Sequence, residues 1–252
     1  MFDRLRRKGF DIATSNHAEA ILSADFKQES QELIDALQRV TIPAVELIAS
    51  GGGEARSTQR LRRSLSSVGW EKHNFRIETT VDGQPIGEGT SHEIDHVRKS
   101  GSGMLALEIE WNNKDPFFDR DLENFQRLHA QTIISVGIIV TRGASLQDAM
   151  LRIIENFLEK NDIKDEFALR EFGMKSRTAR QRESVEKAMV NGESFASAFS
   201  RFFVADKFGM ATTHWSKLMD RIARGVGNPC PLLLIGLPEN VIGSYSAATL
   251  EL

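Results

Sequence analysis

The sequence predicts an α/β domain in which helices flank a mixed central sheet. Helical and strand patterns alternate along the chain, as they do in layered α/β domains. Residues 133–140 are apolar at consecutive positions, which is typical of a strand buried on both faces of a parallel sheet. Residues 92–98 and 104–111 have strand patterns and are separated by a short Gly/Ser-rich segment, so we expect them to pair antiparallel.

The first third of the chain contains two predicted helices and two predicted strands. Apolar residues recur at helical spacing between Glu29 and Ile48, in a helix that Pro43 interrupts. The glycines at 51–53 predict a tight turn rather than a phosphate-binding loop, because no Gly-Lys-Ser/Thr follows them. The next expected elements are a helix over Arg56–Val68 and strands over Trp70–Thr80 and Gly89–Val97, with a turn at Asp82-Gly83.

The remainder of the chain continues the alternation of helices and strands. Asp115 and Pro116 are predicted to be the N-cap and first residue of a helix that runs through Ala130. Another helix is expected from Ser145 to Leu158, with Ser145 and Asp148 in the arrangement of a capping box. The last predicted elements are a mostly helical region over residues 176–203 and a short buried strand over residues 231–237.

Composition excludes several classes of protein. Of the 252 residues, 40% are hydrophobic and 27% charged, which argues against disorder. The one cysteine, Cys230, excludes a disulfide framework and a multi-cysteine zinc site, and with no membrane span or signal peptide expected it favours a cytoplasmic protein that does not contact membranes. A net charge of −3 argues weakly against nucleic-acid binding. That charge is regional, since acidic residues prevail over residues 1–174 and basic residues over residues 175–224.

The predicted strand over residues 104–111 carries the strongest chemical signal. Leu105, Leu107 and Ile109 alternate and share one face, so Glu108 and Glu110 must share the other. Carboxylates two residues apart on a strand stand roughly 6.5–7 Å from each other. Burying them without compensation is unfavourable, which predicts that a partner of opposite charge lies nearby.

Asp95 is the expected third member of this group. If the two strands pair through the Gly/Ser-rich turn, Asp95 lies opposite position 107 or 108 and beside Glu108. Three acidic groups so close together favour a bound cation, and Mg²⁺ selects hard oxygen ligands of this type. The alternative is that these acids are solvated on an edge strand and paired with neighbours such as Arg98.

Polar residues that could read DNA follow the second strand. Asn and Arg side chains bind base edges in bidentate fashion, and Lys suits phosphates. The candidates in this segment are Asn112, Asn113, Lys114 and Arg120, and the alternative is an ordinary loop before a helix. Arg142 and Arg224 are further candidates, each with a structural ion pair as its alternative. Residues 175–182 carry Lys175, Arg177, Arg180 and Arg182 and are the best phosphate-contacting candidate elsewhere.

Three motifs resemble type II restriction endonucleases of the BglII and BamHI group. They are Glu93-Ile-Asp95-His96, the block from Leu107 through Phe125, and the segment from Val136 to Arg142. Scattered similarity continues at residues 212–215, 224–225 and 228–232. The resemblance implies a restriction-endonuclease-like (PD-(D/E)xK) fold in one endonuclease domain over residues 1–252. Its catalytic core would cover about residues 50–160, and its helical and C-terminal DNA-binding or dimer elements about residues 161–252.

The resemblance also implies specific roles. Asp95 and Glu108 would bind Mg²⁺, with the Ile109 carbonyl as an extra ligand, and Glu110 would position or deprotonate the attacking water. Glu54 would add an acidic group from an earlier helix. Two departures from the superfamily pattern are Ile94 where proline is usual and Glu110 where lysine is usual. The second leaves open which group activates the water.

The predicted activity is therefore Mg²⁺-dependent, site-specific hydrolysis of double-stranded DNA. The resemblance implies a homodimer that cuts a short palindrome, for which we expect a GATC-like centre, and a cognate DNA methyltransferase that protects host DNA. One rival hypothesis keeps the fold but makes the chain a structure-specific repair or recombination nuclease. The other is a DNA-binding module without activity, against which the intact Asp95, Glu108 and Glu110 argue.

Overall fold

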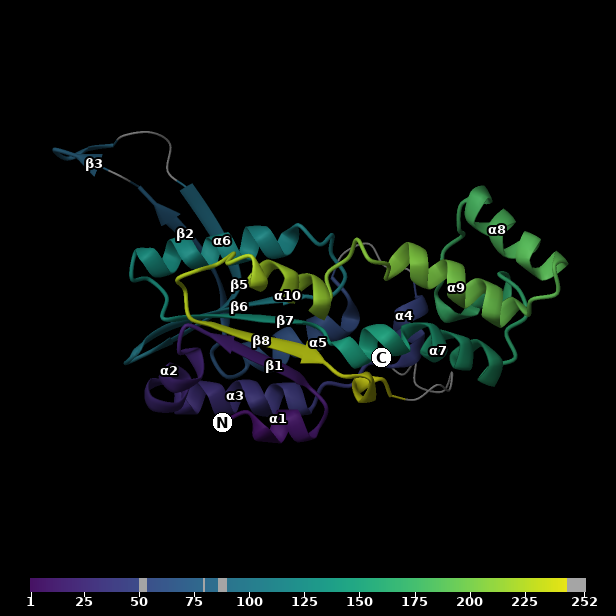
Figure 1. The fold of residues 1–252 in the computed structure, drawn as a ribbon, viewed down its shortest axis with the longest axis horizontal. Coiled ribbons are helices and arrows are strands. Elements are labelled where there is room, and N and C mark those ends of the chain that lie inside the picture. Colours follow the sequence, from purple (N-terminus) through teal and green to yellow (C-terminus); the bar gives the residue numbers. More distant parts are fainter. Residues whose placement is uncertain (50–53, 79, 86–89, 244–252) are drawn as a thin grey trace.

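The computed structural model describes residues 1–49, 54–78, 80–85 and 90–243. A six-stranded sheet with the order β1-β8-β7-β6-β5-β2 forms its centre (Figure 1). The middle strands β6, β7 and β8 are parallel to one another, and the outer strands pair antiparallel. The strands are β1 Asp11–Ser15, β2 Glu71–Ile77, β5 Thr90–Ser100, β6 Gly103–Glu110, β7 Val136–Arg142 and β8 Leu232–Leu237, and a separate two-stranded ribbon joins β3 Thr80–Val81 to β4 Gln84–Pro85.

Helices cover both faces of the sheet. One face of the sheet packs against the larger hydrophobic core. The elements that contribute to this core are α1 Asp3–Arg7, α2 Ala18–Asp25, α3 Lys27–Gln38, α4 Ala44–Ile48, α5 Arg56–Ser66, α7 Ala144–Lys160, α8 Ala179–Val190 and α9 Phe195–Lys207, with the 3-10 turns η1 Ala168–Phe172 and η2 Glu239–Val241. The opposite face is covered by α6 Phe117–Ala130 and α10 Trp215–Ala223 (Figure 1). No described helix combines the length and apolarity that crossing a membrane requires.

The parallel centre of the sheet is buried on both faces, as the apolar runs predict. Every residue of β7 and β8 is buried. Along β6, Leu105, Leu107 and Ile109 belong to the larger hydrophobic core, whereas Ala106 belongs to the smaller core beneath α6 and α10. The mixed α/β architecture is therefore confirmed, and the strands expected over residues 133–140 and 231–237 are present with slightly shifted ends.

Two helix starts differ from the sequence prediction. The first helix residue of α6 is Phe117, and the Asp115 side chain does not cap it but accepts a hydrogen bond from Arg221 at 3.1 Å. Helix α7 begins at Ala144 with Gly143 as its N-cap, so the expected capping box at Ser145 and Asp148 is wrong. In both places a residue from a distant part of the sequence changes the expected local contact: Arg221 binds the Asp115 side chain, and Asp11 accepts from the first backbone N–H of α7. The expected turn at residues 51–53 lies outside the described residues.

Strand β1 at the sheet edge was not predicted, and it supplies the cap for α7. Asp11 on β1 accepts a hydrogen bond from the Ala144 backbone N–H at 2.7 Å through its Oδ2 atom. A Cβ atom at Gly143 would lie 2.5 Å from that oxygen and 2.7 Å from the Leu237 carbonyl oxygen, so glycine is required for the close approach. A carboxylate at the positive end of a helix dipole stabilises the helix.

We predict that Cys230 reacts with thiol reagents only when the chain unfolds. Its side chain is fully buried, burial raises the pKa of the thiol to about 12, and the Sγ atom donates to the Pro231 carbonyl oxygen at 3.4 Å. Reaction requires the accessible thiolate, which the fold suppresses. Labelling with a chromogenic disulfide at pH 8 should be negligible in the native protein and should follow the denaturant unfolding curve. Stoichiometric labelling of native protein within seconds would contradict this.

Candidate functional site

Two carboxyl groups are buried near the end of the central strand β6. The side chains of Glu108 and Glu110 are on the face of β6 that carries Ala106, and each residue is only 3% exposed. Strand β6 lies between β5 and β7, so these are not solvated acids on an edge strand. Arg98, the neighbour considered as their partner, instead pairs with Glu32 at 2.9 Å.

The neighbouring strand brings Asp95 to Glu108. His96 pairs with Leu107 in the antiparallel register, so the next position places Asp95 opposite Glu108, one of the two registers expected from the sequence. The two carboxyl groups lie within hydrogen-bonding reach of each other. Asp95 is exposed, and it therefore forms the side of the group that opens to solvent.

A fourth carboxylate, which the sequence analysis missed, comes from helix α6. Asp121 is fully buried, and its carboxyl group lies against that of Glu110. Arg120 donates to the Oδ1 atom of Asp121, and the Oδ2 atom has no hydrogen-bond partner among the described residues. The signal was present in the helical pattern, because Asp121 falls on the same face as Phe118 and Phe125. We refer to Asp95, Glu108, Glu110 and Asp121 as the acidic cluster.

Burial and mutual repulsion dominate the electrostatics of the acidic cluster. Burial, reinforced by the neighbouring carboxylates, raises the pKa of Glu108 and that of Glu110. Burial likewise raises the pKa of Asp121, although Arg120 opposes this. The Arg120 guanidinium lies 2.7 Å from Asp121 and 3.6 Å from Glu110, and it is half exposed. One guanidinium group cannot balance four carboxylates, so the cluster favours an additional cation.

The donor atoms of the acidic cluster fit a hard divalent cation. They are all carboxylate oxygens, one of them lacks a partner, and Asp95 leaves an open side for water and phosphate. Within the described ranges, no group of three or more His, Cys, Asp or Glu side chains already has the geometry of a metal site. A cation would therefore have to draw these carboxylates together and displace the contacts that they make with one another.

The loop after β6 lies against both the acidic cluster and a distant segment. The Asn113 side-chain amide donates to the Oε2 atom of Glu110 at 2.8 Å. Lys114 is exposed and forms an antiparallel bridge with Thr212. Asn112 is partly buried, and its Oδ1 atom has no partner among the described residues. This loop therefore joins the predicted DNA-reading residues to the predicted catalytic carboxylate.

Two predicted DNA contacts occupy very different environments. Arg142 is fully buried and donates to Thr212 and to the Thr213 carbonyl oxygen, so its guanidinium is not accessible to DNA in this structure. Burial lowers the pKa of Arg142 to about 9. Arg224 follows α10, and its exposed guanidinium lies 3.9 Å from Asp119, which leaves it able to contact a ligand.

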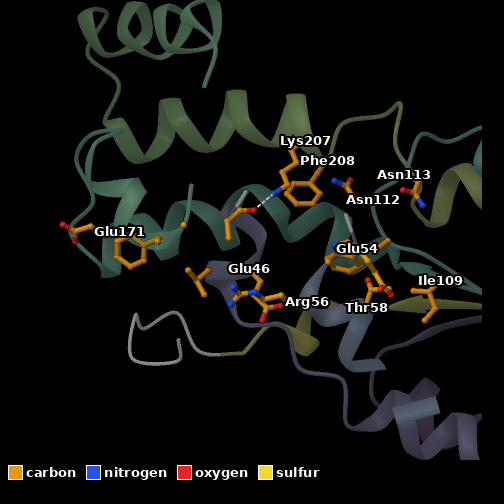
Figure 2. A pocket seen from close by; sticks show the side chains of 16 residues that line it. Glu46, Glu54, Arg56, Thr58, Ile109, Asn112, Asn113, Glu171, Lys207 and Phe208 are labelled. Atoms are coloured by element: carbon orange, nitrogen blue, oxygen red, sulfur yellow. Dashed lines mark hydrogen bonds between the residues drawn. The ribbon is translucent and has the colours of Figure 1, made fainter. Parts of the chain in front are cut away.

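Glu54 lies on the other side of β6 from the acidic cluster. It forms an ion pair with Arg62 at 3.0 Å and lines a cavity of about 500 Å³. Figure 2 shows Glu54 among the residues that line this cavity, together with Thr58, Ile109, Asn112 and Asn113. The side chain of Ile109 faces this cavity, opposite to that of Glu108. Glu54 therefore shares this cavity with Ile109 and with Asn113, which contacts Glu110, but its ion-pair partner is Arg62.

The basic region over residues 175–182 is only partly available to phosphate. The side chain of Arg177 is 6% exposed, and its guanidinium lies 3.2 Å from Glu166 and 3.8 Å from Asp206. Arg180 and Arg182 are exposed on helix α8. The local excess of positive charge is therefore reduced by internal ion pairs.

Comparison with known families agrees with the fold. The family model for restriction endonuclease BglII/BglIII matches residues 10–237, nearly the whole described chain. No curated protein matches the chain. The BglII family has a restriction-endonuclease-like fold, and its members are type II restriction endonucleases, which hydrolyse DNA at specific sites. On the strength of this match, the chain belongs to the BglII-type family of restriction endonucleases.

Proposed function

We propose that this restriction endonuclease uses Mg²⁺ to hydrolyse both strands of a short palindrome, as a two-fold symmetric homodimer. The observation that carries the proposal is the acidic cluster, in which buried carboxylates on β6 and α6 open to solvent at Asp95. Identical subunits related by a two-fold axis would place one such cluster at each strand of a palindromic site. The resemblance to the BglII and BamHI group favours a GATC-centred site and a cognate methyltransferase.

The residues of the acidic cluster are proposed to have different roles in the reaction. Asp95 and Glu108 are proposed to hold the divalent cation, with the Ile109 carbonyl as a further ligand. A bound divalent cation lowers the pKa of a water ligand and offsets the charge that develops on the phosphate. Glu110 is proposed to orient the attacking water or to accept its proton, and the amide of Asn113 donates to one oxygen of that carboxylate at 2.8 Å. Asp121 adds negative charge beside Glu110.

Exposed residues around the cluster are proposed to bind DNA. Lys114 and Arg224 are exposed and suit phosphate contacts. Asn112 lies in the same loop and can present an amide to a base edge. Arg120 is half exposed and bound to the acidic cluster, so a cation at the cluster would release it toward DNA. Binding of nucleic acid would thus depend on neutralising the carboxylates first.

The direct test is digestion of diverse DNA with purified protein and Mg²⁺, followed by sequencing of the fragment ends. Discrete fragments whose ends map symmetrically around one palindrome support a dimeric, site-specific enzyme. Cleavage of flaps or four-way junctions without sequence preference would favour a repair nuclease of the same fold. No cleavage of any substrate would contradict the proposed activity.

We predict that Asp95→Ala and Glu108→Ala each reduce cleavage by at least about a thousandfold, because each removes a ligand of the cation that stabilises the transition state. Glu93→Ala is the matched control. Glu93 is on the same strand as Asp95, but it is exposed and pairs with Lys72 at 2.7 Å. Gel-shift titrations with Ca²⁺ should show that all three variants still bind DNA. Full activity of Asp95→Ala or Glu108→Ala would refute their assignment as metal ligands.

Asp121 should also be required for normal turnover. Asp121→Asn keeps the shape of the side chain but removes a buried negative charge beside Glu110, and we expect a 10- to 100-fold lower rate at limiting Mg²⁺, which higher Mg²⁺ partly restores. Glu123→Gln, an exposed acid on the same helix, serves as the control. Rates measured across a Mg²⁺ series decide the matter, and unchanged rates at low Mg²⁺ would exclude a role for Asp121.

DNA affinity should rise when a divalent ion that does not support cleavage is added. Without a cation, the buried carboxylates repel phosphate and leave only weak, strongly salt-dependent binding. We expect Ca²⁺ to tighten binding of cognate DNA by at least about tenfold, as measured by fluorescence anisotropy. Glu108→Ala, which lacks one proposed ligand of the cation, should respond less to Ca²⁺ than the wild type. An affinity independent of Ca²⁺ in the wild type would show that the carboxylates do not limit binding.

A further inference from the structure

Arg142 is buried in an environment that gives it no counter-charge. It is the last residue of β7, its relative exposure is 0%, and among the described residues no carboxylate forms an ion pair with it. Its guanidinium lies over the ring of Phe208, 5.1 Å from the ring centroid. A buried, unpaired charge is unfavourable, so its hydrogen bonds must offset the lost hydration.

The hydrogen bonds of Arg142 are all directed at one short segment. The Nε and Nη2 atoms donate to the Thr213 carbonyl oxygen at 3.2 and 2.7 Å, and Nη2 also donates to the Thr212 hydroxyl oxygen at 2.6 Å. A planar guanidinium that binds two adjacent acceptors fixes their direction as well as their distance. Residues 212–213 are thereby attached to the end of the central sheet, although they lie 70 residues farther along the chain.

The same segment holds the loop that follows β6. Thr213 donates its backbone N–H to the Asn113 carbonyl oxygen at 2.9 Å, and the Asn113 N–H returns a bond to the Thr213 hydroxyl at 3.1 Å. Asp115 donates its N–H to the Ala211 carbonyl oxygen at 3.0 Å, and Lys114 and Thr212 form the antiparallel bridge between these bonds. The backbone of Asn113 is therefore held on both its N–H and its C=O by one residue, Thr213.

The side chain of Asn113 completes a continuous connection to the acidic cluster, since its amide donates to Glu110 at 2.8 Å. We propose that Arg142 is a positioning residue, which acts through Thr212 and Thr213 to hold Asn113 against Glu110. This inference rests on the proposed function, because it assigns Glu110 to the reaction. In this proposal the buried guanidinium of Arg142 positions other residues and does not contact DNA.

A double-mutant cycle tests the connection. The variants are Arg142→Met, which keeps the length of the side chain but removes the donors, Asn113→Ala, and the two combined. Each single substitution should lower kcat about 100-fold and leave KM within about threefold, because a small displacement of a reacting group is costly to turnover. The kcat of the combined variant should be lower than that of the wild type by no more than about 100- to 300-fold. Coupled residues give such non-additive effects, whereas independent residues would give about 10,000-fold.

Arg152→Met is the control for loss of an arginine from the same part of the chain. Arg152 lies on α7, is exposed and pairs with Glu239 at 2.6 Å, away from residues 211–213. It should retain wild-type kcat and KM. Should Arg142→Met fail to fold, Thr212→Val removes the hydroxyl that accepts from Arg142 Nη2 and should lower kcat less steeply but in the same direction. Effects that multiply, or a raised KM with unchanged kcat in Arg142→Met, would overturn the proposal.

Hydrogen exchange tests the same connection without relying on activity. In Arg142→Met, the amides of Asn113, Asp115 and Thr213 should exchange at least about tenfold faster, whereas the amides of β8 should keep their protection. Arg152→Met should exchange like the wild type at all these sites. Unchanged exchange in Arg142→Met would overturn the positioning role. If Arg142→Met exchanges faster but the wild type cleaves no DNA, the positioning role of Arg142 stands and the proposed function is rejected.

Discussion

Like-charge repulsion inside the sheet is the constraint around which the site is organised. Glu108, Glu110 and Asp121 are buried on one face of the sheet, and the exposed Asp95 lies on the solvent side of the group. Among the described residues, Arg120 is the cation in direct contact with them. A fold optimised only for stability would replace such a group with apolar side chains. The retention of these acids at a buried position is physically reasonable if a cation is bound during function.

A single strand serves both the core and the site because side chains alternate along it. Leu107 and Ile109 pack into the large hydrophobic core, and Glu108 and Glu110 face α6. Strand β6 pairs with β5 as far as Leu107 and with β7 as far as Glu110. Glu108 and Glu110 therefore lie just beyond the last paired residues of β5 and β6, while β6 stays paired with β7.

Sequence patterns predicted the parts of the fold that depend on local periodicity. The alternation along β6 and the short turn before it were enough to predict Asp95 beside Glu108, although they left two registers open. Contacts between distant residues were not predictable in this way. Asp11 caps a helix that begins 133 residues later, and Asp115 is bound to Arg221 rather than to its own helix. Asp121 was detectable in principle, as an acid on an apolar helix face, but its contact with Glu110 requires the tertiary structure.

The distribution of positive charge bears on how the proposed metal ion would affect DNA binding. The basic C-terminal region has an excess of Lys and Arg, yet Arg177 and Arg221 are bound to internal carboxylates, and Lys207 donates to the backbone carbonyl oxygens of Leu47 and Ala49. Arg142 is directed at Thr213. Many of these positively charged side chains therefore stabilise the fold. The exposed ones that remain would have to bind DNA close to the acidic cluster, which repels phosphate. If the acidic cluster binds a divalent ion and the scissile phosphate, as proposed, the ion would neutralise the carboxylates, and metal binding and DNA binding would reinforce each other.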